Sequence, residues 1–194
     1  MLGIIEDNFL SDQVLINKTS PYLDKLGKQI AAKEVTLISS PLSEELVDGY
    51  RSTADGYIAK NMPMIENGEL KNFIVSRYGA ARTGLKRSDS DGGCYIMNGG
   101  DTSLSDIIKN TKKGLFMNRF SAGSPGVNGD VTGVAKNSFL IENGQIVGAV
   151  SETMFSGNLT EMLMNVKAIS SERINDGSCI LPWVDFGGVT VSGK

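Results

Sequence analysis

The chain has 194 residues, of which 40% are hydrophobic, and its formal net charge at pH 7 is −3 with a sequence pI of about 5.1. Its length fits one large domain with a sizeable core. The acidic pI and the interspersed charges argue against nucleic acid as a partner. No apolar run approaches the roughly 20 residues that span a bilayer, so the sequence predicts a soluble, cytoplasmic protein with no membrane partner.

Histidine is absent from the chain. Its absence removes the usual general base, the commonest transition-metal ligand and every Ser-His or Cys-His catalytic pair. Cys94 and Cys179 are the only cysteines, and we interpret both as reduced thiols because a chain of this size needs no disulfide. We therefore predict no catalytic residue and no metal site, with Cys179 as the only candidate ligand.

The first predicted element is a helix over residues 20–32. Ser20 and Pro21 suit its cap and first turn, and four apolar residues recur on one stripe: Tyr22, Leu23, Leu26 and Ile30. Residues 34–39 are short and β-branched, which predicts a strand, and the polar stretch after them predicts a loop.

The sequence Ile-Glu-Asn-Gly occurs twice, at residues 65–68 and 141–144. Asn-Gly between alternating runs is typical of a two-residue hairpin, because both residues tolerate the positive φ of a type I′ turn. The predicted register sets Glu66 opposite Glu69 and Glu142 opposite Gln145. We expect two antiparallel hairpins here.

The region after the first hairpin holds the only basic concentration in the chain, which we interpret as solvated surface: Arg77, Arg82, Lys86 and Arg87. A helix is predicted to begin near Ser103 and to end at Gly114, followed by a strand over 115–120. The last predicted helix is capped by Asn158 and carries apolar residues at helical spacing from Leu159 to Ile169. Together these elements predict an α+β, β-rich fold with barrel-like or sandwich sheets and about three helices.

The glycine-rich stretch 120–133 does not match a phosphate-binding loop, because no Lys-Ser or Lys-Thr closes it. Its backbone is instead free to approach a ligand or a neighbouring strand. We predict that this loop and the start of the last helix share one face that binds peptide or a partner subunit. The candidate residues on this face are Asn128, Gly129, Asp130, Thr132, Gly157 and Asn158.

The chain resembles the C-terminal half of the TldD/PmbA family, historically called modulators of DNA gyrase. The resemblance lies in SPYLDKLGKQIAAKEVTLI, ADGYIAKNMPMIENGELKNFIVSRYGAARTGL, GVNGD, SFLIENGQIVGAVSETMFSGNLTEMLMNV and LPWVDFGGVTVSG, which cover nearly the whole chain in family order. It implies one C-terminal-type domain over residues 1–194, without the family's N-terminal α/β domain. The ending resembles the PmbA (TldE) type, because GSCILPWVD replaces the Cys-Gly-Lys context of a TldD metal ligand.

The resemblance implies a two-subunit cytoplasmic metalloprotease. Its TldD-type subunit carries zinc or another divalent metal on an H-E-x-x-x-H motif and a later Cys, and its PmbA-type subunit lacks these ligands. We therefore expect a metal-free, non-catalytic subunit domain that binds peptide and forms a homo- or heterodimer with a TldD-like partner. Two alternatives stay open: a metallopeptidase in its own right, which would use Cys179 and carboxylates, and a DNA gyrase modulator.

Overall fold

The computed structural model describes residues 2–151 and 153–193, which form two compact units. Unit one consists of Met1–Gly99 and Arg173–Pro182, and unit two of Gly100–Glu172 and Trp183–Lys194. The fold is mixed and rich in sheet, and neither sheet of the described residues closes into a barrel. No helix in the described ranges has the length and apolar character needed to cross a membrane. Two compact units can belong to one domain or to two, so the expectation of a single domain over residues 1–194 stays a prediction.

Unit one combines short helices with short strands. Its elements in chain order are α1 (Leu2–Ile5), the π-helix η1 (Glu6–Leu10), α2 (Asp12–Ile16), β1 (Leu37–Ser39), β2 (Met62–Glu66), β3 (Glu69–Leu70), α3 (Arg77–Thr83) and β4 (Tyr95–Met97). The strands follow the order β3-β2-β1-β4-β10-β9, in which β10 (Ile180–Phe186) runs parallel to β4. The hairpin of β9 (Val166–Asn175) and β10 is divided between the two units.

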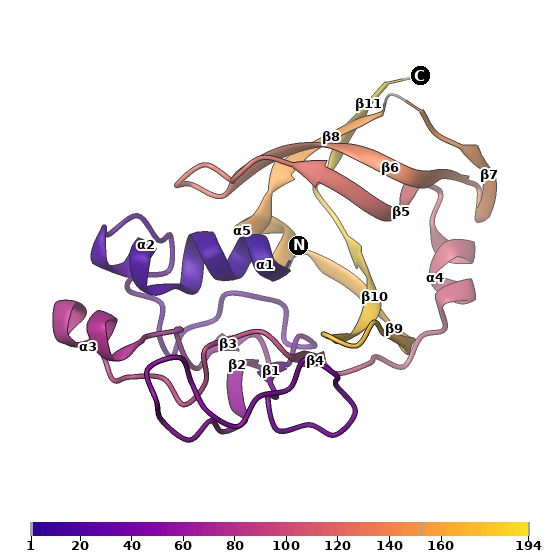
Figure 1. The fold of residues 1–194 in the computed structure, drawn as a ribbon. Coiled ribbons are helices and arrows are strands. Elements are labelled where there is room, and N and C mark those ends of the chain that lie inside the picture. Colours follow the sequence, from indigo (N-terminus) through magenta and orange to yellow (C-terminus); the bar gives the residue numbers. More distant parts are fainter. Residues whose placement is uncertain (1, 152, 194) are drawn as a thin grey trace. The chain divides into compact units, whose positions relative to one another are not determined.

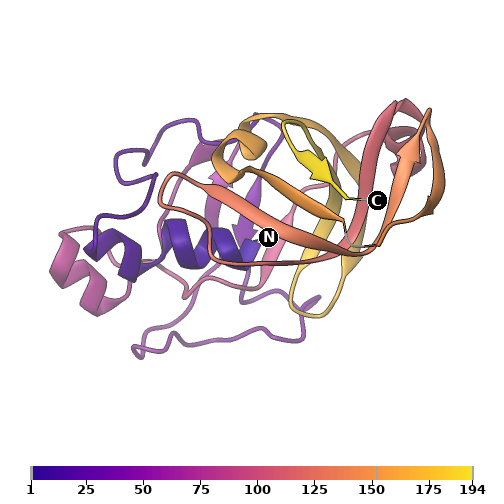
Figure 2. The same cartoon turned by 90° about the horizontal axis from the view of Figure 1, so that it is seen from above.

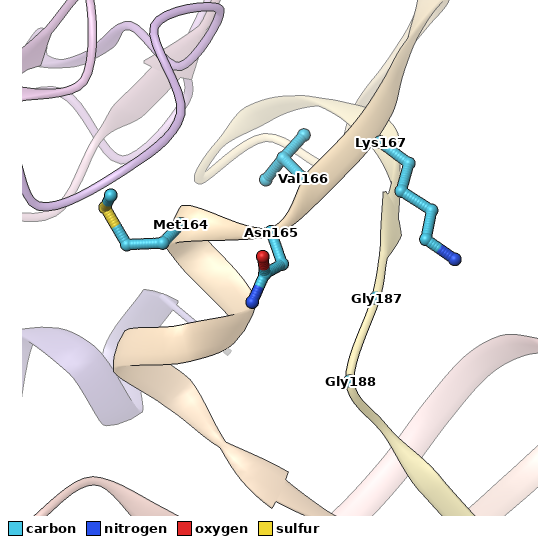
Figure 3. A pocket seen from close by; sticks show the side chains of 6 residues that line it. All are labelled: Met164, Asn165, Val166, Lys167, Gly187 and Gly188. Atoms are coloured by element: carbon cyan, nitrogen blue, oxygen red, sulfur yellow. The ribbon is translucent and has the colours of Figure 1, made fainter.

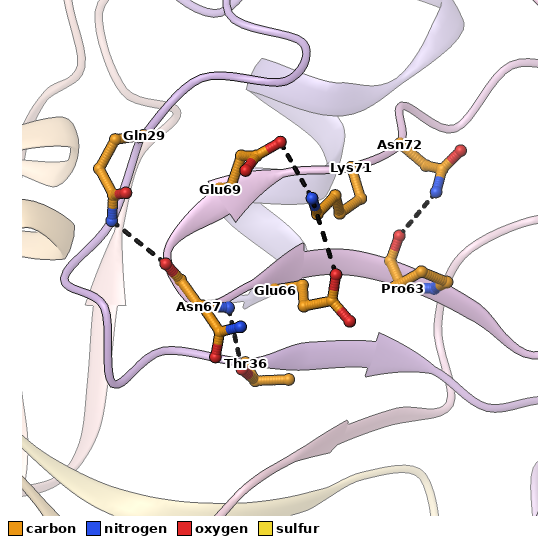
Figure 4. A network of polar contacts seen from close by, with 8 residues as sticks. All are labelled: Gln29, Thr36, Pro63, Glu66, Asn67, Glu69, Lys71 and Asn72. Carbon is orange, nitrogen blue, oxygen red and sulfur yellow. Dashed lines mark hydrogen bonds and ion pairs between the residues drawn. The ribbon is translucent and has the colours of Figure 1, made fainter.

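The first Asn-Gly hairpin is confirmed. Glu66 lies opposite Glu69, as predicted, and Asn67 and Gly68 have φ values of 50° and 79°. Neighbouring segments hold the tip, because the Asn67 N–H donates to Thr36 Oγ1 at 3.1 Å and Gln29 Nε2 donates to the Asn67 carbonyl at 3.3 Å (Figure 4). The tip is therefore an anchored part of unit one.

The predicted helix over residues 20–32 is wrong, since this segment consists of turns. Gly27 has a φ of 74°, which ends any right-handed helix there. The backbone N–H of Gly27 donates to the Leu70 carbonyl, and those of Ile30 and Ala31 donate to the Gly68 carbonyl. The first hairpin thus takes the backbone donors that a helix would have used internally.

Glu6 makes the stability of unit one depend on pH. Burial raises the pKa of its carboxyl, although the Tyr95 hydroxyl donates to Oε2 at 2.6 Å. Because the folded-state pKa lies above the unfolded one, the contribution of Glu6 is fully present below the unfolded pKa and is lost as pH rises through the folded pKa. We expect Glu6→Gln, which still accepts from Tyr95, to flatten the fall in stability above pH 4.5.

Urea denaturation of both proteins across an acidic to neutral pH series measures this effect. Parallel pH profiles for the wild type and Glu6→Gln would contradict it. Glu34→Gln, at an exposed position of the same unit, serves as the control and should reproduce the wild-type profile.

Unit two is built on a long hairpin (Figures 1 and 2). Its elements are α4 (Leu104–Asn110), β5 (Lys113–Ala122), β6 (Asp130–Glu142), β7 (Gln145–Ala149), β8 (Met154–Asn158), α5 (Leu159–Met164) and β11 (Thr190–Ser192), with its parts of β9 and β10. The sheet order is β11-β8-β6-β5, and β7 also pairs with β6. On one face of this sheet, the Phe120 and Phe155 rings meet edge to face with centroids 5.5 Å apart.

The predicted elements of unit two are confirmed with two corrections. The helix that begins after Ser103 ends at Asn110 rather than at Gly114, because β5 already begins at Lys113 and includes Gly114. Glu142 lies opposite Gln145 at the second Asn-Gly tip, and Ser103 caps α4 as predicted. The last helix is shorter than the apolar spacing indicated, because α5 ends at Met164 and Ile169 belongs to β9. Helical spacing from Leu159 onward therefore continues across the boundary between a helix and a strand.

Candidate functional site

The structure brings the six predicted face residues together in unit two. Residues 123–129 form the tip of the β5–β6 hairpin, and Asp130 begins β6. Antiparallel pairing of β6 with β8 sets Asp130 opposite Asn158 and Val131 opposite Gly157, with Thr132 next along β6. The predicted clustering of the hairpin tip with the start of α5 is therefore observed.

Asn158 links the hairpin tip to α5 through both atoms of its side-chain amide. Its Oδ1 accepts from the backbone N–H groups of Thr160 and Glu161 at 3.0 and 3.2 Å, which caps the helix. Its Nδ2 donates to the Asn128 carbonyl at 2.8 Å and to Asp130 Oδ1 at 2.9 Å. One side chain thus fixes the position of the tip relative to the helix.

The Asp130 carboxylate is held in its ionised form at this tip. The side-chain amides of Asn158 and Asn128 both donate to it, the second at 2.6 Å, and these bonds lower the pKa of the Asp130 carboxyl. The side chains of Asn128, Asp130 and Thr132 are exposed. The site therefore presents a fixed negative charge and a polar rim to solvent.

The outer edge of β5 offers backbone hydrogen-bonding groups next to this tip. β5 stands at one end of the strand order, and no strand of the described residues pairs with that edge. A free edge presents the N–H and C=O groups that an extended peptide pairs with when it adds a strand to a sheet. The edge and the tip are continuous, since residues 123–129 directly follow β5.

A shallow hollow of about 460 Å³ lies after α5 and was not predicted from the sequence (Figure 3). It is lined by Met164, Asn165, Val166, Lys167, Gly187 and Gly188. The Gly188 carbonyl comes within 3.6 Å of where a Cβ at Gly157 would lie, so the hollow adjoins the predicted face. The pair Gly187-Gly188 is the signal in the sequence that could have indicated it.

The described residues do not fit a metal centre. They contain no group of three or more Cys, Asp or Glu side chains placed to hold an ion, and the chain has no histidine. Cys179 lies in the turn between β9 and β10, where its backbone N–H donates to Asp176 Oδ1 at 2.8 Å. The described residues therefore offer no fitting set of ligands through which a metal could act.

The chain is similar along most of its length to proteins named as metalloproteases. It is 29% identical to the metalloprotease PmbA of Escherichia coli O157:H7 over 182 residues, which are 88% of this chain and 40% of that protein. A metalloprotease of Methanocaldococcus jannaschii is 28% identical over 182 residues, covering 87% of this chain and 40% of the relative. The chain thus spans about two fifths of the length of these relatives.

Solved structures show the same fold. A proposed modulator of DNA gyrase from Bacteroides thetaiotaomicron matches with a TM-score of 0.89 and 26% identity, over 100% of this chain and 44% of that one. TldE from Thermococcus kodakarensis matches with a TM-score of 0.83 and 25% identity, over 98% of this chain and 48% of that one. The family model described as the PmbA/TldA metallopeptidase C-terminal domain matches residues 2–193. The chain therefore belongs to the PmbA/TldD metallopeptidase family, as the resemblance of its sequence motifs implied.

Proposed function

We propose that this chain is a metal-free, non-catalytic subunit domain of a TldD/TldE-like metalloprotease and that it binds extended peptide. A TldD-like partner would supply the zinc or other divalent metal, in a homo- or heterodimeric assembly. The observation that carries the proposal is a mismatch: the family is one of metallopeptidases, whereas the chain has no histidine and its described residues hold no fitting set of metal ligands. Two similar proteins carry the names PmbA and TldE, which supports a subunit of the PmbA (TldE) type.

Peptide binding is supported by the free edge of β5 and the tip that continues it. An extended peptide could pair with the edge through its backbone, which gives affinity without demanding a particular sequence. The ordered tip, with Asn128 and Asp130 exposed, would contact peptide groups beyond the strand. Such a surface suits a protease complex that processes unfolded or extended chains.

The central test is the metal content and activity of the isolated protein and of its complex. We expect the purified chain to hold no stoichiometric zinc or iron in elemental analysis, because without histidine the single candidate ligand Cys179 and scattered carboxylates cannot form a stable site at ordinary metal levels. Mixing with a TldD-like subunit from the same cell should yield a complex with peptidase activity. One tightly held transition metal per isolated chain would favour the alternative of an independent metallopeptidase.

The double substitution Asn128→Ala and Asp130→Ala tests the hairpin tip. We expect peptide cleavage by the complex to become about tenfold less efficient, while the melting temperature falls by only a few degrees, since the lost hydrogen bonds are exposed. Asn158 would still cap α5 and still donate to the Asn128 backbone carbonyl. Steady-state peptidase assays and thermal denaturation measure the two effects.

Asp101→Ala combined with Asn110→Ala is the matched control. Both residues are exposed in unit two and lie outside the candidate face. This variant should keep wild-type activity and stability. Unchanged cleavage in the Asn128/Asp130 variant would reject a role for the tip, whatever the metal content of the chain.

A further inference from the structure

Unit one carries a surface that the proposed function does not use. We call it the Tyr57 face and define it by Tyr57, Ile58, Lys60, Arg77, Tyr78 and Arg87. It includes two of the cations that the sequence alone indicated only as solvated surface. The side chains of Ile58, Tyr78 and Tyr57 are 79%, 64% and 41% exposed. Single exposed apolar residues are common, but tyrosine and arginine are enriched in binding sites, and here the Arg87 guanidinium lies over the Tyr57 ring.

The Tyr57 face is built by two segments that lie side by side. Asp55 joins them, because its Oδ2 accepts from the Arg77 backbone N–H at 2.7 Å and its Oδ1 accepts from the Thr53 hydroxyl at 2.7 Å. The Lys60 backbone N–H donates to the Asp89 carbonyl at 2.9 Å. These contacts hold residues 53–60 against α3 and the segment after it.

Arg87 is pre-positioned on this face. Its guanidinium carbon lies 3.9 Å from the centroid of the Tyr57 ring, the geometry of a cation–π contact. A stacked guanidinium keeps its edge free for bidentate hydrogen bonds to a carboxylate and has already lost part of its rotational freedom. Arg87 can therefore bind an acidic group with little further ordering.

The charge of this region is opposite to that of the chain. Residues 51–91 contain seven lysines and arginines and five aspartates and glutamates, in a chain whose net charge is −3. The three ion pairs among the described residues leave out every cation of the Tyr57 face. Two aspartates of this region are already hydrogen-bonded: Asp55 to Thr53 and to the Arg77 backbone, and Asp91 to the Ala54 backbone N–H. Asp89 lies two residues after Arg87.

We propose that the Tyr57 face docks an acidic segment of a partner protein, in which aspartate or glutamate alternates with leucine-like side chains. Carboxylates would pair with Arg77 and Arg87, and apolar side chains would cover Ile58 and Tyr78. A polyanion such as DNA fits less well, because the remaining acidic surface of the chain repels it and Ile58 offers it no partner. The proposal concerns unit one and is independent of the peptide site of unit two.

Fluorescence anisotropy tests this with three labelled probes: a short peptide of alternating glutamate and leucine, its glutamine counterpart, and a short DNA duplex. The wild-type chain should bind the glutamate peptide and bind the other two more weakly. Arg77→Gln combined with Arg87→Gln should weaken peptide binding about tenfold, and Tyr78→Ala several-fold. Arg87→Lys should lose part of the affinity, because it keeps the charge without the planar fork.

The matched control is Lys33→Gln combined with Arg173→Gln, which removes the same charge from exposed positions of unit one outside the face. It should bind the peptide like the wild type. An equal loss in this control, no binding by the wild type, or tighter binding of the duplex would each overturn the proposal. If the Arg77/Arg87 variant unfolds, the single substitution Arg77→Gln replaces it, because it leaves the contact between Arg87 and Tyr57 intact. Wild-type affinity of the Arg77→Gln protein for the glutamate peptide would also overturn the proposal.

Discussion

Replacing Gly68 with alanine is expected to lower the free energy of unfolding by about 2–5 kcal/mol. Gly68 has a φ of 79°, and a side chain at such a φ costs about 1–2 kcal/mol. The new Cβ would also overlap the Gln29 side chain and the carbonyl oxygens of Ala31 and Ala32. Overpacking of this kind costs about 1–3 kcal/mol, and here backbone atoms would have to move.

Gly56→Ala separates the cost of a side chain at positive φ from the cost of steric overlap. Gly56 has a φ of 85° in the same unit, but nothing lies within 4 Å of where its Cβ would be. We therefore expect only the conformational cost of about 1–2 kcal/mol there. Urea denaturation followed by circular dichroism measures both variants. Equal losses in the two proteins would show that the anchoring of the first hairpin tip contributes nothing.

Phe155→Ala is expected to destabilise unit two by about 3–5 kcal/mol. The Phe155 side chain is 3% exposed, and its ring meets Phe120 edge to face. It also covers Gly133 on the neighbouring strand, where a Cβ would come within 2.7 Å of the ring. Alanine would leave a cavity over a glycine, a position that has no side chain of its own to fill it.

Met154→Ala is the control for this prediction. Met154 precedes Phe155 on β8, its side chain points to the opposite face, and it is 44% exposed. Its truncation should cost less than about 1 kcal/mol, because surface substitutions away from packed features have small effects. Calorimetric scans of both variants give the comparison, and a Met154 variant as unstable as the Phe155 variant would contradict the assignment of the packed face.

The sequence predicts those parts of the fold that short-range chemistry determines. Both Asn-Gly tips need positive φ at adjacent residues, and few residues other than Asn and Gly adopt it, so their position and register follow from local sequence. The cap of α4 at Ser103 is equally local, since the hydroxyl accepts from the Asp106 N–H. These elements form as expected because their own residues specify the turn and the cap, and the bonds that distant segments add, such as that from the Asn67 N–H to Thr36, leave this local geometry unchanged.

The incorrect helix prediction arises from contacts with residues that are distant in sequence. Residues 20–32 carry a helical pattern, but Ile30 and Ala31 donate to Gly68, and no local signal indicates that contact. The candidate site depends on both local signals and contacts between distant segments. Its residues were indicated by glycine content and a cap, whereas the bond from Asn158 to Asp130 exists only because β8 pairs with β6 in one register. Strand pairing depends on which segments pack together, which residue patterns alone do not specify.

The division of each unit into two separate stretches of chain has a consequence for synthesis on the ribosome. Ile96 on β4 pairs with Ile180 on β10, so unit one gains this strand pair only after all of Gly100–Glu172 has been made. Until then the nascent chain carries an exposed strand edge, which attracts wrong partners and chaperones. Synthesis of Arg173–Pro182, rather than of Met1–Gly99 alone, therefore sets the time at which unit one can complete its folding.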